Sequence, residues 1–121
     1  MGRFFKPNRR GELGRRSRRA GLAVARARRL RGAILQLLDE QAPERLDADV
    51  LLGVLERLHY DVTARELAAE LEYLRQRGYV EFEMVETRER RRLPRILRIG
   101  ITAGGADLVE GTLADPGVDL E

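Results

Sequence analysis

Cysteine and tryptophan are absent from this chain of 121 residues, and histidine occurs once, as His59. Without cysteine the chain can form no disulfide, no thiolate nucleophile and no thiolate–metal bond. One histidine cannot build a metal site on paired histidines, and we expect His59 to lie near a helix C-terminus rather than to act in catalysis. No segment approaches the roughly 18 uninterrupted apolar residues of a membrane-spanning helix. These absences predict a cytoplasmic protein that is not an enzyme, binds no metal or cofactor and does not enter a membrane.

Positive charge comes almost wholly from arginine and is unevenly distributed. Residues 1–31 carry Lys6 and eleven arginines against one acid, a net charge of +11, whereas the remaining ninety residues have a net charge of −8. A second basic cluster, 88–98, carries six arginines and one glutamate. Guanidinium groups suit bidentate contacts with phosphate, and blocks of like charge often bind polyanions. A GC-rich genome would produce the same arginine bias without any function, and that alternative stays open.

The first half of the chain predicts a flexible arm followed by two helices. With 43% hydrophobic and 36% charged residues, a folded domain is expected. Residues 1–22 combine arginines with glycines and show no apolar period, so we expect a basic, flexible N-terminal arm. Helical spacing of apolar residues predicts helices at about 23–41 and 48–59. Asp47 is the expected cap of the second helix, with Leu46 packing on Leu51 beside it.

A third helix has the clearest start signal in the sequence. Thr63 and Glu66 have the spacing of a capping box, in which each side chain accepts a hydrogen bond from the other residue's backbone amide. Leucines at 67, 71 and 74 would form its buried face, and Gly78 would end it in the left-handed conformation.

After Gly78 the apolar period changes from helical to alternating. Residues 80–84 and 97–101 each alternate apolar with other residues, which predicts two antiparallel strands joined by the basic loop. Thr102 is the expected cap of a short last helix that includes Leu113 and ends at 115–117. We therefore expect one domain over 23–114 and an acidic tail over 115–121.

Three helices followed by a hairpin with a basic tip is the layout of a winged helix-turn-helix domain. The segment from Leu71 to Val80, LEYLRQRGYV, resembles the junction between recognition helix and wing in bacterial winged-helix regulators of the ArsR-like superfamily. Ile101–Gly105, ITAGG, resembles the step by which many of them leave the wing. The ending over 103–117 resembles short winged-helix proteins of Mu-like prophages. This resemblance covers about 25–113 and implies an α+β, mainly helical fold with three helices, a two-stranded wing and a short C-terminal helix.

The resemblance also implies where nucleic acid would bind. In DNA-binding members the third helix enters the major groove and the wing touches the backbone, which here assigns base contacts to Arg65, Ala69 and Gln76. Residues 61–77 have a net charge of −1, so the wing is the better candidate. The expected phosphate contacts are the wing arginines and those of the N-terminal arm: Arg88, Arg90, Arg91, Arg92 and Arg95, and Arg9, Arg10, Arg15, Arg16, Arg18 and Arg19.

The sequence therefore predicts a DNA-binding protein, a transcriptional regulator of phage or prophage type, whose partner is double-stranded DNA and which can form a homodimer. A protein-docking module and an RNA- or ribosome-associated protein remain alternatives, motivated by the acids of the third helix and by the arm respectively. The wing arginines can equally be a solvated loop that discourages strand pairing. The arm can equally be an RNA-binding tail, a targeting peptide or the product of a misassigned start.

Overall fold

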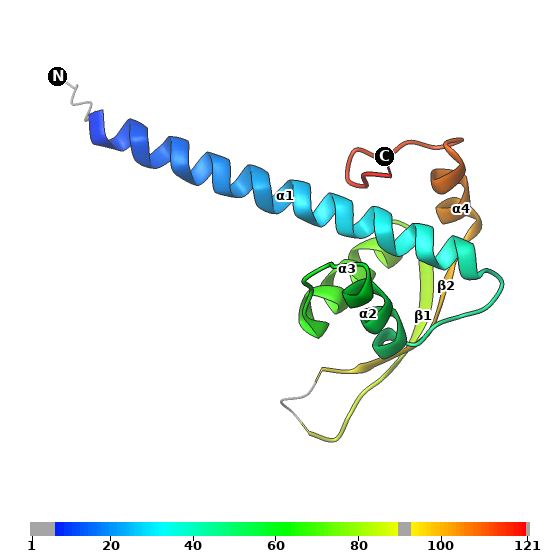
Figure 1. Cartoon of the computed structure of the whole chain (residues 1–121). Helices are drawn as coiled ribbons and strands as arrows, with labels where there is room; N and C mark the ends of the chain where they lie inside the picture. Colours follow the sequence, from blue (N-terminus) through cyan, green and yellow to red (C-terminus); the bar gives the residue numbers. More distant parts are fainter. Residues whose placement is uncertain (1–6, 90–92, 121) are drawn as a thin grey trace.

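The computed structural model describes the backbone of residues 7–89 and 93–120, with side chains from residue 20 onward in those ranges. The fold is α+β and mainly helical (Figure 1). Its elements are α1 (Pro7–Gln41), α2 (Ala48–Arg57), α3 (Ala64–Gln76), β1 (Val80–Val85), β2 (Arg95–Ile101) and α4 (Ala103–Glu110). The two strands form one antiparallel sheet.

Helix α1 begins at Pro7 rather than near residue 23, so residues 7–22, expected to lack regular structure, are helical. Once the packed part of a helix has formed, each further residue adds one hydrogen bond without a new nucleation cost. Arginine, a strong helix former, supplies six of the sixteen residues in 7–22, although the three glycines there each cost roughly 1 kcal/mol. The N-terminal half of α1 projects away from the body of the molecule (Figure 1). Its C-terminal half ends at Gln41, as the following Ala42–Pro43 step predicts.

Helix α2 ends at Arg57, two residues before the predicted end. Asp47 occupies its N-cap position but makes no side-chain capping bond, which corrects the sequence prediction. The Asp47 carboxylate instead accepts a hydrogen bond from the backbone amide of Arg98 at 3.0 Å. Leu46 likewise pairs with a strand, because it exchanges backbone hydrogen bonds of 3.0 and 2.7 Å with Ile99.

The predicted capping box of α3 is confirmed. The Thr63 hydroxyl accepts from the Glu66 amide at 3.1 Å, and the Glu66 carboxylate accepts from the Thr63 amide at 3.3 Å. Gly78 follows the helix with φ of 82°, a backbone conformation that costs free energy for any residue other than glycine. The turn then places Val80 at the start of β1.

The hairpin contains a bulge that joins it to the α1–α2 loop. Glu81 pairs with Gly100 and Glu83 with Leu97, so Phe82 alone stands opposite two residues of β2, Arg98 and Ile99. Arg98 lies in the left-handed region with φ of 56°. The bulge frees the backbone of 98–99 to bind Asp47 and Leu46, so the loop before α2 adds a one-residue bridge to the sheet.

Helix α4 ends at Glu110, earlier than the sequence predicted, because Gly111 takes the left-handed terminating conformation with φ of 89°. Leu113, expected in the helix, lies beyond it and is exposed. The predicted cap is confirmed, since the Thr102 hydroxyl accepts from the Gly105 amide at 3.1 Å. Residues 115–120, expected to form a tail, return to α1, where the Asp119 amide donates to the Arg28 carbonyl at 3.0 Å.

One apolar core joins these elements. It is made of leucines and isoleucines of α1, α2 and α3 with residues of the sheet, α4 and the returning C-terminal segment. The largest fully buried side chains are Ile34, Leu35, Leu38, Leu51, Leu55, Leu67, Leu71, Leu74 and Ile99. The predicted leucine face of α3 is confirmed. This core fixes α3 between α1 and the hairpin, which positions the surface described next.

Candidate nucleic-acid interface

The described residues of the basic cluster 88–98 lie in the loop that joins β1 to β2 and in the first part of β2. Arg88 and Arg95 are exposed, and no described side chain forms an ion pair with either. Arg90, Arg91 and Arg92 lie outside the described residues. Thus the two described wing arginines of the predicted site are exposed and form no ion pair with an acid of the described chain.

The residues assigned to base contacts lie on α3 and reach the surface. Arg65, Ala69 and Gln76 are all exposed. Gln76 is partly engaged, because its side-chain amide donates to the Glu72 carboxylate at 3.4 Å. Arg65 forms no ion pair with a described residue. The structure therefore brings an exposed arginine and a small residue to the first half of this helix.

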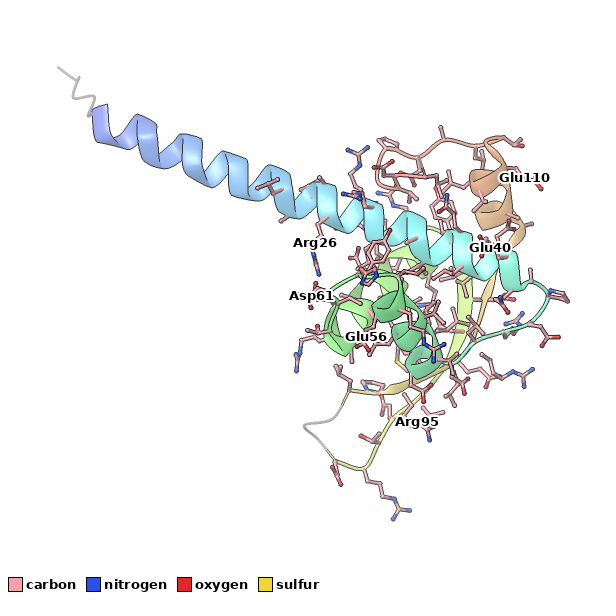
Figure 2. The ribbon with its side chains drawn as sticks, in the orientation of Figure 1. Arg26, Glu40, Glu56, Asp61, Arg95 and Glu110 are labelled. Atoms are coloured by element: carbon pink, nitrogen blue, oxygen red, sulfur yellow. The ribbon has the colours of Figure 1, made fainter. Side chains whose placement is uncertain are left out.

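The acids of α3, which seemed to oppose nucleic-acid binding, are each paired with an arginine. Arg26 of α1 binds the Glu66 carboxylate and the carbonyl of Asp61, and it points towards the start of α3 (Figure 2). Its guanidinium holds the pKa of Glu66 below the ordinary glutamate value. This carboxylate therefore stays ionised within an ion pair, and its charge is offset locally.

A second arginine of α1 neutralises the next acid along α3. The Arg31 Nε donates to the Glu70 carboxylate at 2.7 Å, and both side chains are largely buried, with 16% and 14% exposed. The same guanidinium donates to the Gly117 carbonyl at 3.0 Å and lies 3.6 Å from the centroid of the Tyr73 ring. Arg31 thus joins α1, α3 and the C-terminal segment.

The third acid is paired within α3 itself. Arg75 forms an ion pair with Glu72 one turn earlier, and this guanidinium lowers the pKa of Glu72 below its ordinary value. With Glu66, Glu70 and Glu72 all paired, the net charge of −1 over 61–77 overstates the negative potential of this helix. Its acids are compensated by arginines of α1 and of α3.

The arginines of the N-terminal arm lie in the projecting half of α1. Arg9, Arg10, Arg15, Arg16, Arg18 and Arg19 all fall within the helical range that begins at Pro7, and their side chains lie outside the described part of the chain. At 1.5 Å per residue, the helix before Arg26 extends about 28 Å. The arm therefore carries a dense row of basic residues well beyond the body (Figure 1).

Sequence reasoning missed the arginines that join α1 to α3. Arg26 is half exposed where it meets Glu66, whereas Arg31 is largely buried against Glu70. Sequence reasoning also missed the contact between the start of α2 and β2. No local signal reveals these pairs, because their partners lie 35 to 86 residues away along the chain.

The acids of the hairpin are exposed to solvent. Glu81, Glu83 and Glu86 are all exposed, and Glu81 pairs with Arg45. Among the described residues no group of three or more histidines, cysteines, aspartates or glutamates is arranged to hold a metal ion. No helix in that same part of the chain is long and apolar enough to cross a membrane.

Comparisons with known proteins add nothing to this geometry: no family model, no curated protein and no solved structure matches the chain.

Proposed function

We propose that the chain is a winged-helix protein that binds double-stranded DNA, as a transcriptional regulator of phage or prophage type. The hairpin, as the wing, and the N-terminal half of α1 contact phosphates. Helix α3 lies against the groove with Arg65 and Ala69 toward the bases.

The arrangement of elements supports the fold assignment. Three helices precede a two-stranded hairpin, and the one-residue Leu46–Ile99 bridge joins the α1–α2 loop to that hairpin. Three helices followed by a two-stranded hairpin is the layout that the resemblance to winged-helix regulators implies.

The distribution of paired and unpaired charge carries the proposal. Every acid within α3 is bound by an arginine, whereas Arg65, Arg88 and Arg95 are exposed and form no ion pair with a described residue. Exposed, uncompensated guanidinium groups are what phosphate recognition needs. The alternative of a protein-docking module rested on the acidic side chains of α3. Because each of these acids is paired with an arginine, the support for that alternative is weaker.

The placement of the basic segments also supports the proposal. In Figure 1 the projecting half of α1 and the described parts of the loop between β1 and β2 extend toward the same side of the body, with α3 between them. A duplex placed against α3 would then have arginine-bearing segments on both sides. Such flanking contacts to phosphate fix the register of a protein on DNA.

The first test compares the full chain with a 22–121 variant on random duplex DNA over a salt series. If about six arm arginines meet phosphates, the slope of log K against log salt is steeper by roughly 5 for the full chain, at about 0.9 per contact. Equal slopes would show that the arm arginines do not contact the DNA phosphates. Preference of both proteins for structured RNA over duplex would support the RNA alternative instead.

The second test removes single wing charges. Arg88→Gln and Arg95→Gln should each weaken duplex binding and lower the slope by about 0.9. Arg45→Gln is the matched control, because this arginine already pairs with Glu81 and should leave the slope unchanged. Full affinity in a variant lacking Arg88, Arg95 and the loop arginines 90–92 would contradict a role for the wing.

A further inference from the structure

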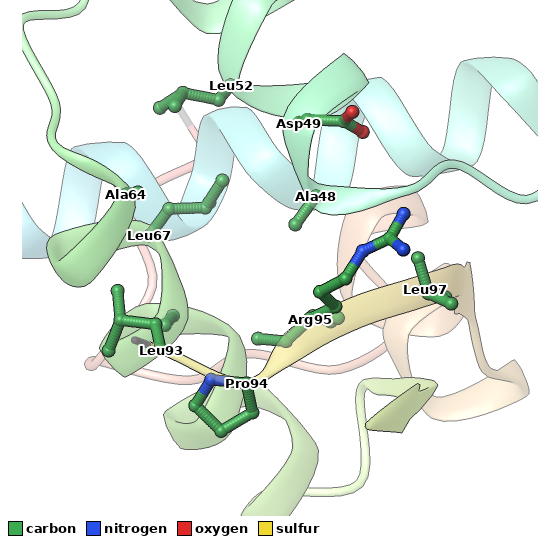
Figure 3. A pocket seen from close by; sticks show the side chains of 11 residues that line it. Ala48, Asp49, Leu52, Ala64, Leu67, Leu93, Pro94, Arg95 and Leu97 are labelled. Carbon is green, nitrogen blue, oxygen red and sulfur yellow. The ribbon is translucent and has the colours of Figure 1, made fainter. Parts of the chain in front are cut away.

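A cavity of about 240 Å³ lies between the start of α2, the start of α3 and the first residues of β2 (Figure 3). Its walls are mainly apolar, formed by Leu52, Leu67, Ala68, Leu93, Pro94 and Leu97. A cavity of roughly 150 Å³ lined by such residues holds benzene. This one therefore has room for an aromatic or branched aliphatic group with a short polar extension.

Two charged residues of opposite sign also line the cavity. Asp49 of α2 and Arg95 of β2 lie together on one side, away from Leu93 and Pro94 (Figure 3). They form no ion pair with each other or with another described residue. One Asp49 oxygen accepts from the Val50 amide at 2.9 Å, which leaves its second oxygen available to a ligand.

We propose that this cavity binds a free α-amino acid with an apolar side chain. The side chain occupies the space among the leucines, the carboxylate pairs with Arg95, and the ammonium group pairs with Asp49. An apolar carboxylate would pair with Arg95 but would be repelled by the Asp49 carboxylate. An apolar amine would pair with Asp49 but would be repelled by the Arg95 guanidinium. Only a ligand that carries both charges beside an apolar group complements the whole cavity.

The binding test needs no DNA and uses the full chain. L-phenylalanine is titrated while backbone amide resonances are followed by NMR, with 3-phenylpropanoate, which lacks the ammonium group, and phenethylamine, which lacks the carboxylate, as comparisons. Saturable shifts are expected at Leu52, Ala68 and Leu97. Each comparison compound should bind about tenfold more weakly, because it loses one charge-assisted hydrogen bond. Absence of saturable shifts with L-phenylalanine at these residues would overturn the proposal.

Variants separate a direct contact from a structural effect. Arg95→Gln should weaken the binding of L-phenylalanine about tenfold and leave the binding of phenethylamine unchanged. Asp49→Asn should leave the binding of 3-phenylpropanoate unchanged. Equal weakening of all three compounds by either variant would contradict the assigned contacts. Ala68→Leu should fill the cavity and abolish binding, while Ala69→Leu, at the exposed neighbouring position, should not.

Binding at this cavity has a further consequence that rests on the proposed function. Arg95 is also a wing arginine, so a bound carboxylate removes one candidate phosphate contact. Saturating L-phenylalanine should then lower the salt slope of duplex binding by about 0.9 in the native protein and not in Arg95→Gln. An unchanged slope in a protein that binds both the amino acid and DNA would contradict this coupling and leave the cavity assignment intact.

Discussion

Arg31 holds three separate parts of the chain together. Its guanidinium binds the Glu70 carboxylate of α3 and the Gly117 carbonyl, and it stacks on the Tyr73 ring. Because Arg31 and Glu70 are both largely buried, loss of one partner leaves the other charge poorly solvated.

Arg31→Ala should therefore lower the free energy of unfolding by about 2 kcal/mol, measured by urea denaturation. Arg29→Ala is the control on the same helix, since Arg29 is exposed, and it should change stability by less than about 0.5 kcal/mol. Equal effects of the two substitutions would show that helix propensity rather than the buried pair decides the result.

The buried Asp115 creates a second residue-scale effect, on the titration of Tyr79. The Tyr79 hydroxyl donates to the Asp115 carboxylate at 2.5 Å, and Arg77 binds the same carboxylate at 3.0 Å. Burial, reinforced by Asp115, raises the pKa of Tyr79 from 10.0 to about 12. The Tyr79 hydrogen bond is also the main reason that the pKa of Asp115 lies below its ordinary value.

Because the folded pKa of Tyr79 exceeds the unfolded one, its contribution to stability is complete below pH 10 and is lost as pH rises toward 12. The Tyr79→Phe variant should not lose this share of its free energy of unfolding at alkaline pH. The difference in free energy of unfolding between the native protein and the variant should therefore shrink from pH 10 to 12. Denaturation curves at several pH values test this, with tyrosinate absorbance as an independent readout. A difference that stays constant with pH would contradict the raised pKa.

At the scale of elements, the junction between the hairpin and α4 depends on close approach of backbones. A Cβ atom at Gly105 would lie 2.3 Å from the Tyr79 carbonyl oxygen and 2.7 Å from an Ile101 side-chain carbon. At Gly104 the nearest atom would be 3.4 Å away, an ordinary contact. The close approach at this junction therefore requires glycine at position 105 and not at position 104.

Gly105→Ala should consequently destabilise the protein by about 1–3 kcal/mol. Gly104→Ala, in the same turn of the same helix, should be neutral or stabilise by about 0.5 kcal/mol through helix propensity. Thermal unfolding of the two variants side by side checks the contrast. Similar losses in both would show that the approach of α4 to β1 is looser than the distances imply.

Elements defined by neighbouring residues could be predicted from the sequence, and those decided by distant partners could not. The capping box of Thr63 and Glu66, the turn at Gly78 and the two strands follow from local signals, and each was confirmed. The alternation of buried and exposed residues is not kept throughout, because Met84 is exposed and a bulge interrupts the pairing. Asp47 also has the local signature of a cap, but the Arg98 amide at the bulge competes successfully for its carboxylate. The continuation of α1 to Pro7 escaped prediction because its polar segment lacks an apolar period.

The same distinction applies to the candidate interface. Arg65, Arg88 and Arg95, which the sequence assigns to nucleic-acid contacts, are exposed, and that assignment stays a prediction. The pairing of the α3 acids with α1 depends on how the two helices cross, and the cavity depends on the meeting of three separate segments. Neither is encoded in a short stretch of residues.

At the scale of the whole molecule, the C-terminal segment closes the fold by returning to α1. Gly32 makes this possible, because a Cβ atom there would lie 1.8 Å from the Asp119 carbonyl oxygen. The Asp119 amide then reaches the Arg28 carbonyl, and the Gln36 side chain donates to the Leu120 carbonyl at 3.0 Å.

Gly32→Ala should displace this segment, lower the free energy of unfolding by about 1–3 kcal/mol and speed hydrogen exchange at the Asp119 amide. Gly21→Ala is the control on the same helix, since no atom lies within 4 Å of its Cβ position, and it should preserve or slightly raise stability. Unaltered exchange at Asp119 in Gly32→Ala would contradict the docking of the C-terminus on α1.

The continuity of α1 has a mechanical consequence. Its distal half and the half that contains Arg26 and Arg31 form a single helix, and these arginines bind acids one turn apart on α3. Because α1 is one continuous helix, a movement of its N-terminal half is transmitted to α3 through the Arg26–Glu66 and Arg31–Glu70 ion pairs. Whatever engages the distal arginines therefore also acts on the orientation of the helix held between α1 and the hairpin.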